Sequence, residues 1–164
     1  KDSNNLYAES MYYQLAAATG SRPATTKHAR EAERVLLRKV GLNPANYRLA
    51  DGSGLSLYNY LSAEAEVKLL RYAYQNENIF HHLYQALPIA GVDGTLKKRM
   101  RSTFTRNNVR AKTGTLTGIS SLAGYCKAAN EHWLCFAIIN QGVMHARNAK
   151  NFQNRVCTIL CAPN

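Results

Sequence analysis

The stretch that decides the fold is "NNVRAKTGTLTGISSLAGYCKAANEHWLCFAIINQ", residues 107–141. Three short segments in it, 107–114, 120–128 and 132–141, are rich in β-branched, aromatic and apolar residues, and they are separated by a glycine turn and by "AANE". This pattern predicts three consecutive antiparallel strands. A sheet of only three strands leaves an unpaired edge, so the pattern also suggests that something pairs with it.

Helical patterns lie on both sides of this meander. Capping residues, apolar residues about four apart and glycine stops predict helices over residues 3–20, 25–41, 62–76 and 145–160, with shorter helical pieces at 77–88 and 94–104. The expected apolar faces are Ala29, Ala32, Val35, Leu36 and Val40 in the second helix, Val67, Leu70 and Tyr74 in the third, and Ala149, Phe152, Val156 and Leu160 in the last. Helices, then a strand meander, then a closing helix make an α+β fold.

The composition is that of a globular domain with a strong positive charge. The chain has 164 residues, 46% of them hydrophobic, and a formal net charge of +11. Its basic residues cluster in "KHAREAERVLLRK", "LKKRMR" and "NNVRAK". No zinc-finger spacing, RRM-type aromatic signature or basic region with heptads accompanies them, so no nucleic-acid partner is expected. A binding module for an anionic polymer remains an alternative.

The four cysteines, Cys126, Cys135, Cys157 and Cys161, all lie in the last quarter of the chain. Their spacings match no common zinc pattern, and neither a metal nor a cofactor is expected. Two interpretations stay open. Cys126 and Cys135 face each other across the predicted hairpin and form a disulfide, or the cysteines are small buried hydrophobes.

Lys112-Thr113-Gly114, inside the opening stretch, is the first candidate for chemistry. On a strand, Lys112 and Gly114 point to one face and Thr113 to the other. The lysine offers a cation to a substrate carboxylate, and the glycine lets another backbone approach closely. Thr115 and Thr117 add hydroxyls at the same strand end. The alternative is a charged strand that runs into a glycine turn.

Ser3-Asn4-Asn5, directly before the first predicted helix, is the second candidate. Its simplest interpretation is helix capping, because Ser and Asn side chains accept hydrogen bonds from free N–H groups. The functional alternative is the Ser-x-Asn element that accompanies Ser-x-x-Lys and Lys-Thr-Gly in penicillin-recognising serine enzymes. Ser-x-Asn first and Lys-Thr-Gly on a late strand is the order that such enzymes use.

Four ordered blocks carry a resemblance to a known family. They are "DSNNLYAESMYYQLAAATG" at 2–20, "LADGSGLSLYNYLSA" at 49–63, "LPIAGVDGTLKKRM" at 87–100 and "VRAKTGTLTGISSLAGY" at 109–125. Together they resemble the low-molecular-mass class C penicillin-binding proteins, which are D-Ala-D-Ala carboxypeptidases and endopeptidases. The fold implied is the C-terminal part of a β-lactamase/transpeptidase-like domain.

The resemblance implies a role for each matching residue. Ser3 relays a proton between the nucleophile and the leaving amine, and Asn5 hydrogen-bonds the acyl part of the substrate. Lys112 holds the field positive and hydrogen-bonds Ser3. The hydroxyls of Thr113 and Thr117 bind the terminal carboxylate, next to Gly114, and the N–H of Thr115 supplies half of an oxyanion hole. The "DGSG" block is expected to shape the site.

One family element is absent from the sequence. None of its serines has a lysine three residues later, so the Ser-x-x-Lys nucleophile and base are missing; the nearest spacing, Thr95-x-x-Lys98, is read as an exposed helix start. We therefore expect residues 1–164 to be a single partial domain whose N-terminal part, with the Ser-x-x-Lys and further strands, lies upstream. The chain alone is expected to be inactive.

The function expected from the resemblance is that of a serine-type D-Ala-D-Ala carboxypeptidase or endopeptidase that works through an acyl-enzyme. Its implied partners are peptidoglycan stem peptides ending in D-Ala-D-Ala, β-lactam antibiotics and the missing N-terminal part of the same protein, and its implied location is periplasmic or cell-envelope. Alternatives are a β-lactamase-like hydrolase, a basic binding module and a non-catalytic relative.

Overall fold

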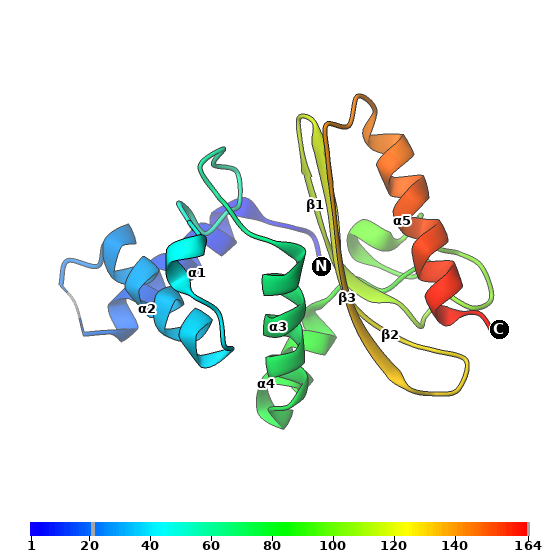
Figure 1. Ribbon diagram of the computed structural model, residues 1–164, viewed down its shortest axis with the longest axis horizontal. Helices are drawn as coiled ribbons and strands as arrows, with labels where there is room; N and C mark the ends of the chain where they lie inside the picture. The colour runs from blue at the N-terminus through cyan, green and yellow to red at the C-terminus, as the bar shows by residue number, and fades with distance from the viewer. Residues whose placement is uncertain (21, 164) are drawn as a thin grey trace. The chain divides into compact units, whose positions relative to one another are not determined.

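The computed structural model describes residues 1–20 and 22–163 and has the predicted order of helices, meander and closing helix (Figure 1). The elements are α1 (Asn5–Ala18), α2 (Thr26–Lys39), η1 (Pro44–Asn46), α3 (Ala63–Tyr74), α4 (Glu77–Ala86), η2 (Gly94–Leu96), β1 (Arg110–Leu116), β2 (Ile119–Lys127), β3 (Trp133–Gln141) and α5 (Ala146–Cys161). They form two compact units, one of residues 1–3 and 66–164 and one of residues 4–65.

The sheet is the predicted antiparallel meander in the order β1-β2-β3. Thr117 and Gly118 form the two-residue turn between β1 and β2, and the φ of Gly118, 75°, is one that this turn requires and that glycine adopts without cost. β1 begins at Arg110, so the preceding residues of the predicted strand lead into the sheet and do not belong to it. The predicted α+β class is confirmed.

Helix α5 packs on one face of the sheet and closes the main core (Figure 1). The buried core residues are Ala90, Leu96, Met100, Val109, Ala111, Leu122, Cys126, Phe136, Cys157 and Cys161. The buried residues of the helix are Ala149, Gln153, Cys157 and Cys161, so Ala149 of the predicted face is buried and Leu160 packs against the core, but the buried face is rotated from the predicted one. Phe152, predicted to be inward, is 44% exposed.

A buried glutamine explains why the buried face of α5 differs from the predicted one. Gln153 is fully buried, and its amide donates to Ser120 Oγ at 3.2 Å and to Asn140 Oδ1 at 3.0 Å. Its carbonyl oxygen accepts from Arg99 Nη2 at 2.9 Å. Because all these groups are paired, a polar side chain can be buried where an amphipathic pattern places a solvent-facing one.

An aromatic cluster covers the opposite face of the sheet. Phe80 and Tyr84 from α4 pack against Tyr125 and Trp133, with ring centroids 5.1–6.2 Å apart. The hydroxyl of Tyr125 donates to Leu70 O at 2.6 Å, which satisfies the one polar group of a buried ring. Trp133 is a half-buried member of this cluster.

Three other helical predictions were wrong. Only η2 forms within 94–104, because Met100 takes a left-handed backbone with φ 51° and is buried. In α2 Ala29 is buried as predicted, but the second buried residue is Leu37, whereas Val35, predicted to be buried, is 60% exposed and Leu36 is 38% exposed. Tyr74 of α3 packs on aromatic rings but is 43% exposed.

The unit of residues 4–65 has its own small core, in which α1 and α2 meet at Tyr12, Ala16 and Ala29. Tyr12 donates from its hydroxyl to Glu33 Oε2 at 3.0 Å. Burial raises the pKa of the Glu33 carboxyl to about 7, although the hydrogen bond from Tyr12 opposes this shift. Burial also raises the pKa of Tyr12, and the charge of Glu33 raises it further.

All four cysteines are free thiols. Cys135 pairs with Tyr125, so its side chain lies on the aromatic face of the sheet, while Cys126 lies in the α5 core with Cys157 and Cys161. The disulfide interpretation is therefore wrong for this structure, and three of the cysteines are small buried hydrophobes. No helix among the described residues is long and apolar enough to cross a membrane.

Candidate active site

The outer edge of β1 is the frame of the candidate site. Ala111 donates its backbone N–H to Pro88 O at 3.1 Å, away from β2. Backbone N–H directions alternate along an antiparallel strand, so the N–H groups of Thr113 and Thr115 point to the same outer edge. The N–H of Thr115 is therefore not used for pairing with β2. An oxyanion donor at this residue would need an N–H that points away from β2 in this way.

Lys112 joins this edge to the start of the chain. Its ammonium donates to Ser3 Oγ at 2.7 Å and to Thr113 O at 2.6 Å. Loss of hydration around the ammonium lowers the pKa of Lys112, even though much of its side chain is exposed. The contact joins two of the predicted site residues, Ser3 and Lys112, which are 109 positions apart in the sequence.

Ser3 itself has an unusual backbone. Its φ is 58°, in the left-handed region that costs a non-glycine residue about 1–2 kcal/mol. Such outliers persist where surrounding contacts hold them, and they gather at functional sites. Asn4, and not Ser3, caps α1, because its side chain accepts from the N–H of Tyr7 at 3.0 Å. The Ser3 hydroxyl instead accepts from Lys112. Asn5 is the exposed first residue of α1, in the unit of residues 4–65.

The other residues of the strand occupy distinct positions. Gly114 pairs with Ser121, and a Cβ on Gly114 would overlap the Ser121 hydroxyl, so a larger residue at 114 would force this hydroxyl to rotate away. Thr113 and Thr115 share one face and lie about 7 Å apart along a regular strand. Thr117 lies in the hairpin turn, directly after the end of β1.

The "DGTL" turn lies beside Ser3 and β1. The Asp93 carboxylate accepts from the N–H of Ile89 at 2.7 Å and forms an ion pair with Lys1. Burial alone would raise the pKa of Asp93, but these two donors lower it below its usual range. Thr95 contacts both the Lys1 backbone and the Thr113 hydroxyl. The sequence predicts only an exposed helix start at Thr95, and no local sequence signal points to its contacts across the fold.

The "DGSG" block forms a turn in the unit of residues 4–65, and Glu9 of α1 accepts from the N–H groups of Gly52 and Ser53 at 2.8 and 3.0 Å. The Asp51 carboxylate accepts from Ser53 Oγ, the N–H groups of Gly54 and Ser56, and Asn59 Nδ2, at 2.8–3.1 Å. Burial opposes ionisation, but these donors lower the pKa of Asp51. Internal hydrogen bonds and the contact with Glu9 thus fix the shape of the block.

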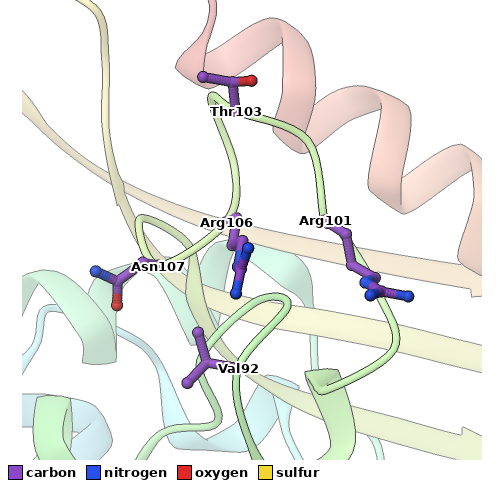
Figure 2. Close-up of a pocket in the computed structure, with 5 residues that line it drawn as sticks. All are labelled: Val92, Arg101, Thr103, Arg106 and Asn107. Atoms are coloured by element: carbon purple, nitrogen blue, oxygen red, sulfur yellow. The ribbon is translucent and has the colours of Figure 1, made fainter.

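A second feature of the unit containing the sheet is a basic groove of about 620 Å³. Figure 2 shows its lining: Val92, Arg101, Thr103, Arg106 and Asn107. None of these is acidic, and neither arginine has an ion pair among the described residues. The groove therefore has the chemistry to hold an anionic group. No group of three or more metal-ligating side chains occurs in the part of the chain that the structure describes.

The model of the D-Ala-D-Ala carboxypeptidase 3 (S13) family matches residues 1–162. The chain belongs to the S13 family. The D-alanyl-D-alanine carboxypeptidase DacB of Haemophilus influenzae is 38% identical over 138 residues, which are 83% of this chain and 29% of that protein. The S13 chain thus spans about a third of the length of this relative, and the predicted resemblance is confirmed at the level of the family.

Solved structures give the same result for the fold. The chain is similar to penicillin-binding protein 4 (dacB) from Haemophilus influenzae, complexed with a β-lactam, with a TM-score of 0.89 and 32% identity over 99% of this chain and 40% of that chain. It is also similar to the TLA-3 extended-spectrum β-lactamase, with a TM-score of 0.60 and 17% identity over 79% of this chain and 52% of that one. The second likeness shows the shared fold alone. The S13 chain therefore has the predicted β-lactamase/transpeptidase-like fold.

Proposed function

We propose that this chain is the substrate-holding part of a serine-type D-Ala-D-Ala carboxypeptidase or endopeptidase that binds penicillins. The observation that carries the proposal is the contact of Lys112 Nζ with Ser3 Oγ at 2.7 Å, beside an open strand edge. A cation, a relay hydroxyl and outward N–H groups are the groups that acyl transfer to a serine needs around its nucleophile. S13 membership supports the same chemistry.

Each residue then has a proposed role. Ser3 relays the proton to the leaving amine, and Lys112 orients Ser3 and attracts the C-terminal carboxylate of the peptide. The Thr113 hydroxyl binds that carboxylate, and the N–H of Thr115 stabilises the oxyanion. Asn5 hydrogen-bonds the acyl part of the substrate. Thr117, in the hairpin turn at the end of β1, is the second hydroxyl proposed for that carboxylate.

The attacking serine and its lysine base belong to residues outside this chain. Two observations support this: no serine of the chain has a lysine three residues later, and the chain covers 29% of the Haemophilus influenzae carboxypeptidase. We therefore propose that residues 1–164 are one part of a penicillin-binding domain and require that other part for catalysis. Peptidoglycan stem peptides and β-lactams are the proposed ligands, and the cell envelope is the proposed location, since the substrate is found there.

The test uses the full-length protein and a diacetylated L-Lys-D-Ala-D-Ala peptide. The expected result is release of free D-alanine, which a penicillin inhibits by forming a stable acyl-enzyme. A peptide ending in L-Ala-L-Ala serves as the control and should release nothing. Rapid turnover of the penicillin without release of D-alanine would instead show a β-lactamase. Absence of both activities would contradict the proposal.

The basic groove favours a second function, binding of an anionic wall polymer. Arg101 and Arg106 lack carboxylate partners among the described side chains, so their charges are available to a ligand. The test is pull-down of the protein on an anionic wall polymer. A steep fall in the amount of bound protein with rising salt and in an Arg101→Gln/Arg106→Gln variant would support this function. Equal binding by an Arg147→Gln/Arg155→Gln control would assign the effect to the groove rather than to net charge.

A further inference from the structure

Thr95 makes contact with both sides of the Lys112 site. Its hydroxyl accepts from Thr113 Oγ1 at 2.9 Å. Its backbone N–H donates to the carbonyl of Lys1 at 3.2 Å, two residues before Ser3. One residue of the "DGTL" turn is thus in contact with the strand and with the segment that carries the relay serine.

The surrounding turn fixes the position of Thr95. Gly94 has a φ of 52°, and a Cβ there would come within 2.6 Å of Lys1 O, so the two segments pack backbone against backbone. Asp93 anchors the turn through the N–H of Ile89 and the ammonium of Lys1. On the other side, Lys97 donates its N–H to Gly94 O at 3.2 Å. The Thr95 hydroxyl is therefore held at a fixed place beside Thr113.

We infer that Thr95 is a positioning residue that prepares the Thr113 hydroxyl to bind the substrate carboxylate. This inference rests on the proposed function and adds a residue to it. Each hydroxyl has one hydrogen, and hydroxyl hydrogens rotate to suit their partners. In the free site Thr113 donates to Thr95.

Binding of a carboxylate requires the opposite arrangement. Thr113 must turn its O–H toward the anion, and its oxygen then accepts the hydrogen that Thr95 donates. No covalent bond forms or breaks; two O–H groups rotate together. The pair gains from cooperativity, because a hydroxyl that accepts a hydrogen bond is a better donor to a charged group.

The matched variants are Thr95→Val, which keeps the β-branched shape and removes the hydroxyl, and Thr95→Ser, which keeps the hydroxyl. Thr158→Val is the control, since Thr158 lies on α5 and its hydroxyl donates to Asn154 O of the same helix at 3.0 Å. The measurement is the acylation rate of the full-length protein by benzylpenicillin and by its methyl ester, which lacks the carboxylate charge. Thermal unfolding of each variant is recorded alongside.

Thr95→Val should slow acylation by benzylpenicillin about 10-fold, the effect of one lost hydrogen bond in a charged network. Its rate with the methyl ester should match that of the unaltered protein, and Thr95→Ser should restore the preference for the free acid. An equal loss with acid and ester, or no loss with either, would overturn the inference while leaving the proposed function intact. No acylation of the unaltered protein would overturn the proposed function and this inference with it.

Discussion

At the scale of single residues, two carboxyls in the unit of residues 4–65 show how surroundings decide charge. Asp51 has four hydrogen-bond donors, which lower its pKa against the effect of burial. Glu33 is more deeply buried, and among the described residues it accepts a hydrogen bond only from Tyr12. Burial therefore outweighs this one donor and raises the pKa of Glu33 to about 7. The number of donors thus separates a charged structural carboxylate from one that titrates near neutral pH.

Glu33 should make the protein less stable as the pH rises. Its pKa increases from 4.5 to about 7 on folding, so between these values the folded state holds a proton that the unfolded state releases. The free energy of unfolding should therefore fall from pH 5 to pH 8. After allowance for partial exposure, the fall should be about 1 kcal/mol. Urea unfolding of Glu33→Gln should lack this part of the pH dependence.

Glu31→Gln is the matched control for that experiment, since Glu31 lies on the same helix with its side chain 63% exposed. It should keep the slope of the unaltered protein. An unchanged slope in Glu33→Gln would show that Glu33 is ionised in the folded state throughout this range.

At the scale of elements, the sheet could be predicted and parts of the helices could not. Alternation and turn residues are local signals, so the meander could be read from 107–141. Residues 94–104 have helix-forming side chains, but tertiary contacts outweigh that preference: Arg99 donates to Gln153 and Asn154 of α5, and Met100 enters the core.

The candidate site divides in the same way. Ser3, Lys112 and Thr113 could be found because they stand in short motifs of known chemistry. Thr95 could not, since its partner Thr113 is 18 residues away and only the fold brings them together. The outward direction of the Thr115 N–H likewise depends on which edge of β1 is paired. The Lys-Thr-Gly motif contains no information about that edge.

Gly124 of β2 tests the packing of the meander. A Cβ at this position would overlap the backbone of Arg110 and Ala111 on β1. Gly124→Ala should therefore destabilise the protein by about 2–3 kcal/mol, because the strands must separate to make room. Ser121→Ala on the same strand should stay within about 1 kcal/mol in the same thermal unfolding experiment. Equal stability of both variants would contradict the register of β1 and β2.

At the scale of the whole molecule, the chain is proposed to carry the groups that hold and orient a substrate, and the proposed nucleophile lies elsewhere. The S13 match over residues 1–162 and the TM-score of 0.89 with penicillin-binding protein 4 show the family and the fold, and within this fold Lys112 contacts Ser3. The proposed function therefore depends on Lys112 more than on any other residue.

The most direct test is covalent labelling of the full-length protein by a fluorescent penicillin, with Lys112→Ala and the control Lys98→Ala. Lys98 is an exposed lysine for which no hydrogen bond or ion pair is found among the described residues. The unaltered protein and Lys98→Ala should label at the same rate, and Lys112→Ala should label at least about 100-fold more slowly, as expected when a charged group of such a site is lost. Labelling of Lys112→Ala at the unaltered rate would contradict the account.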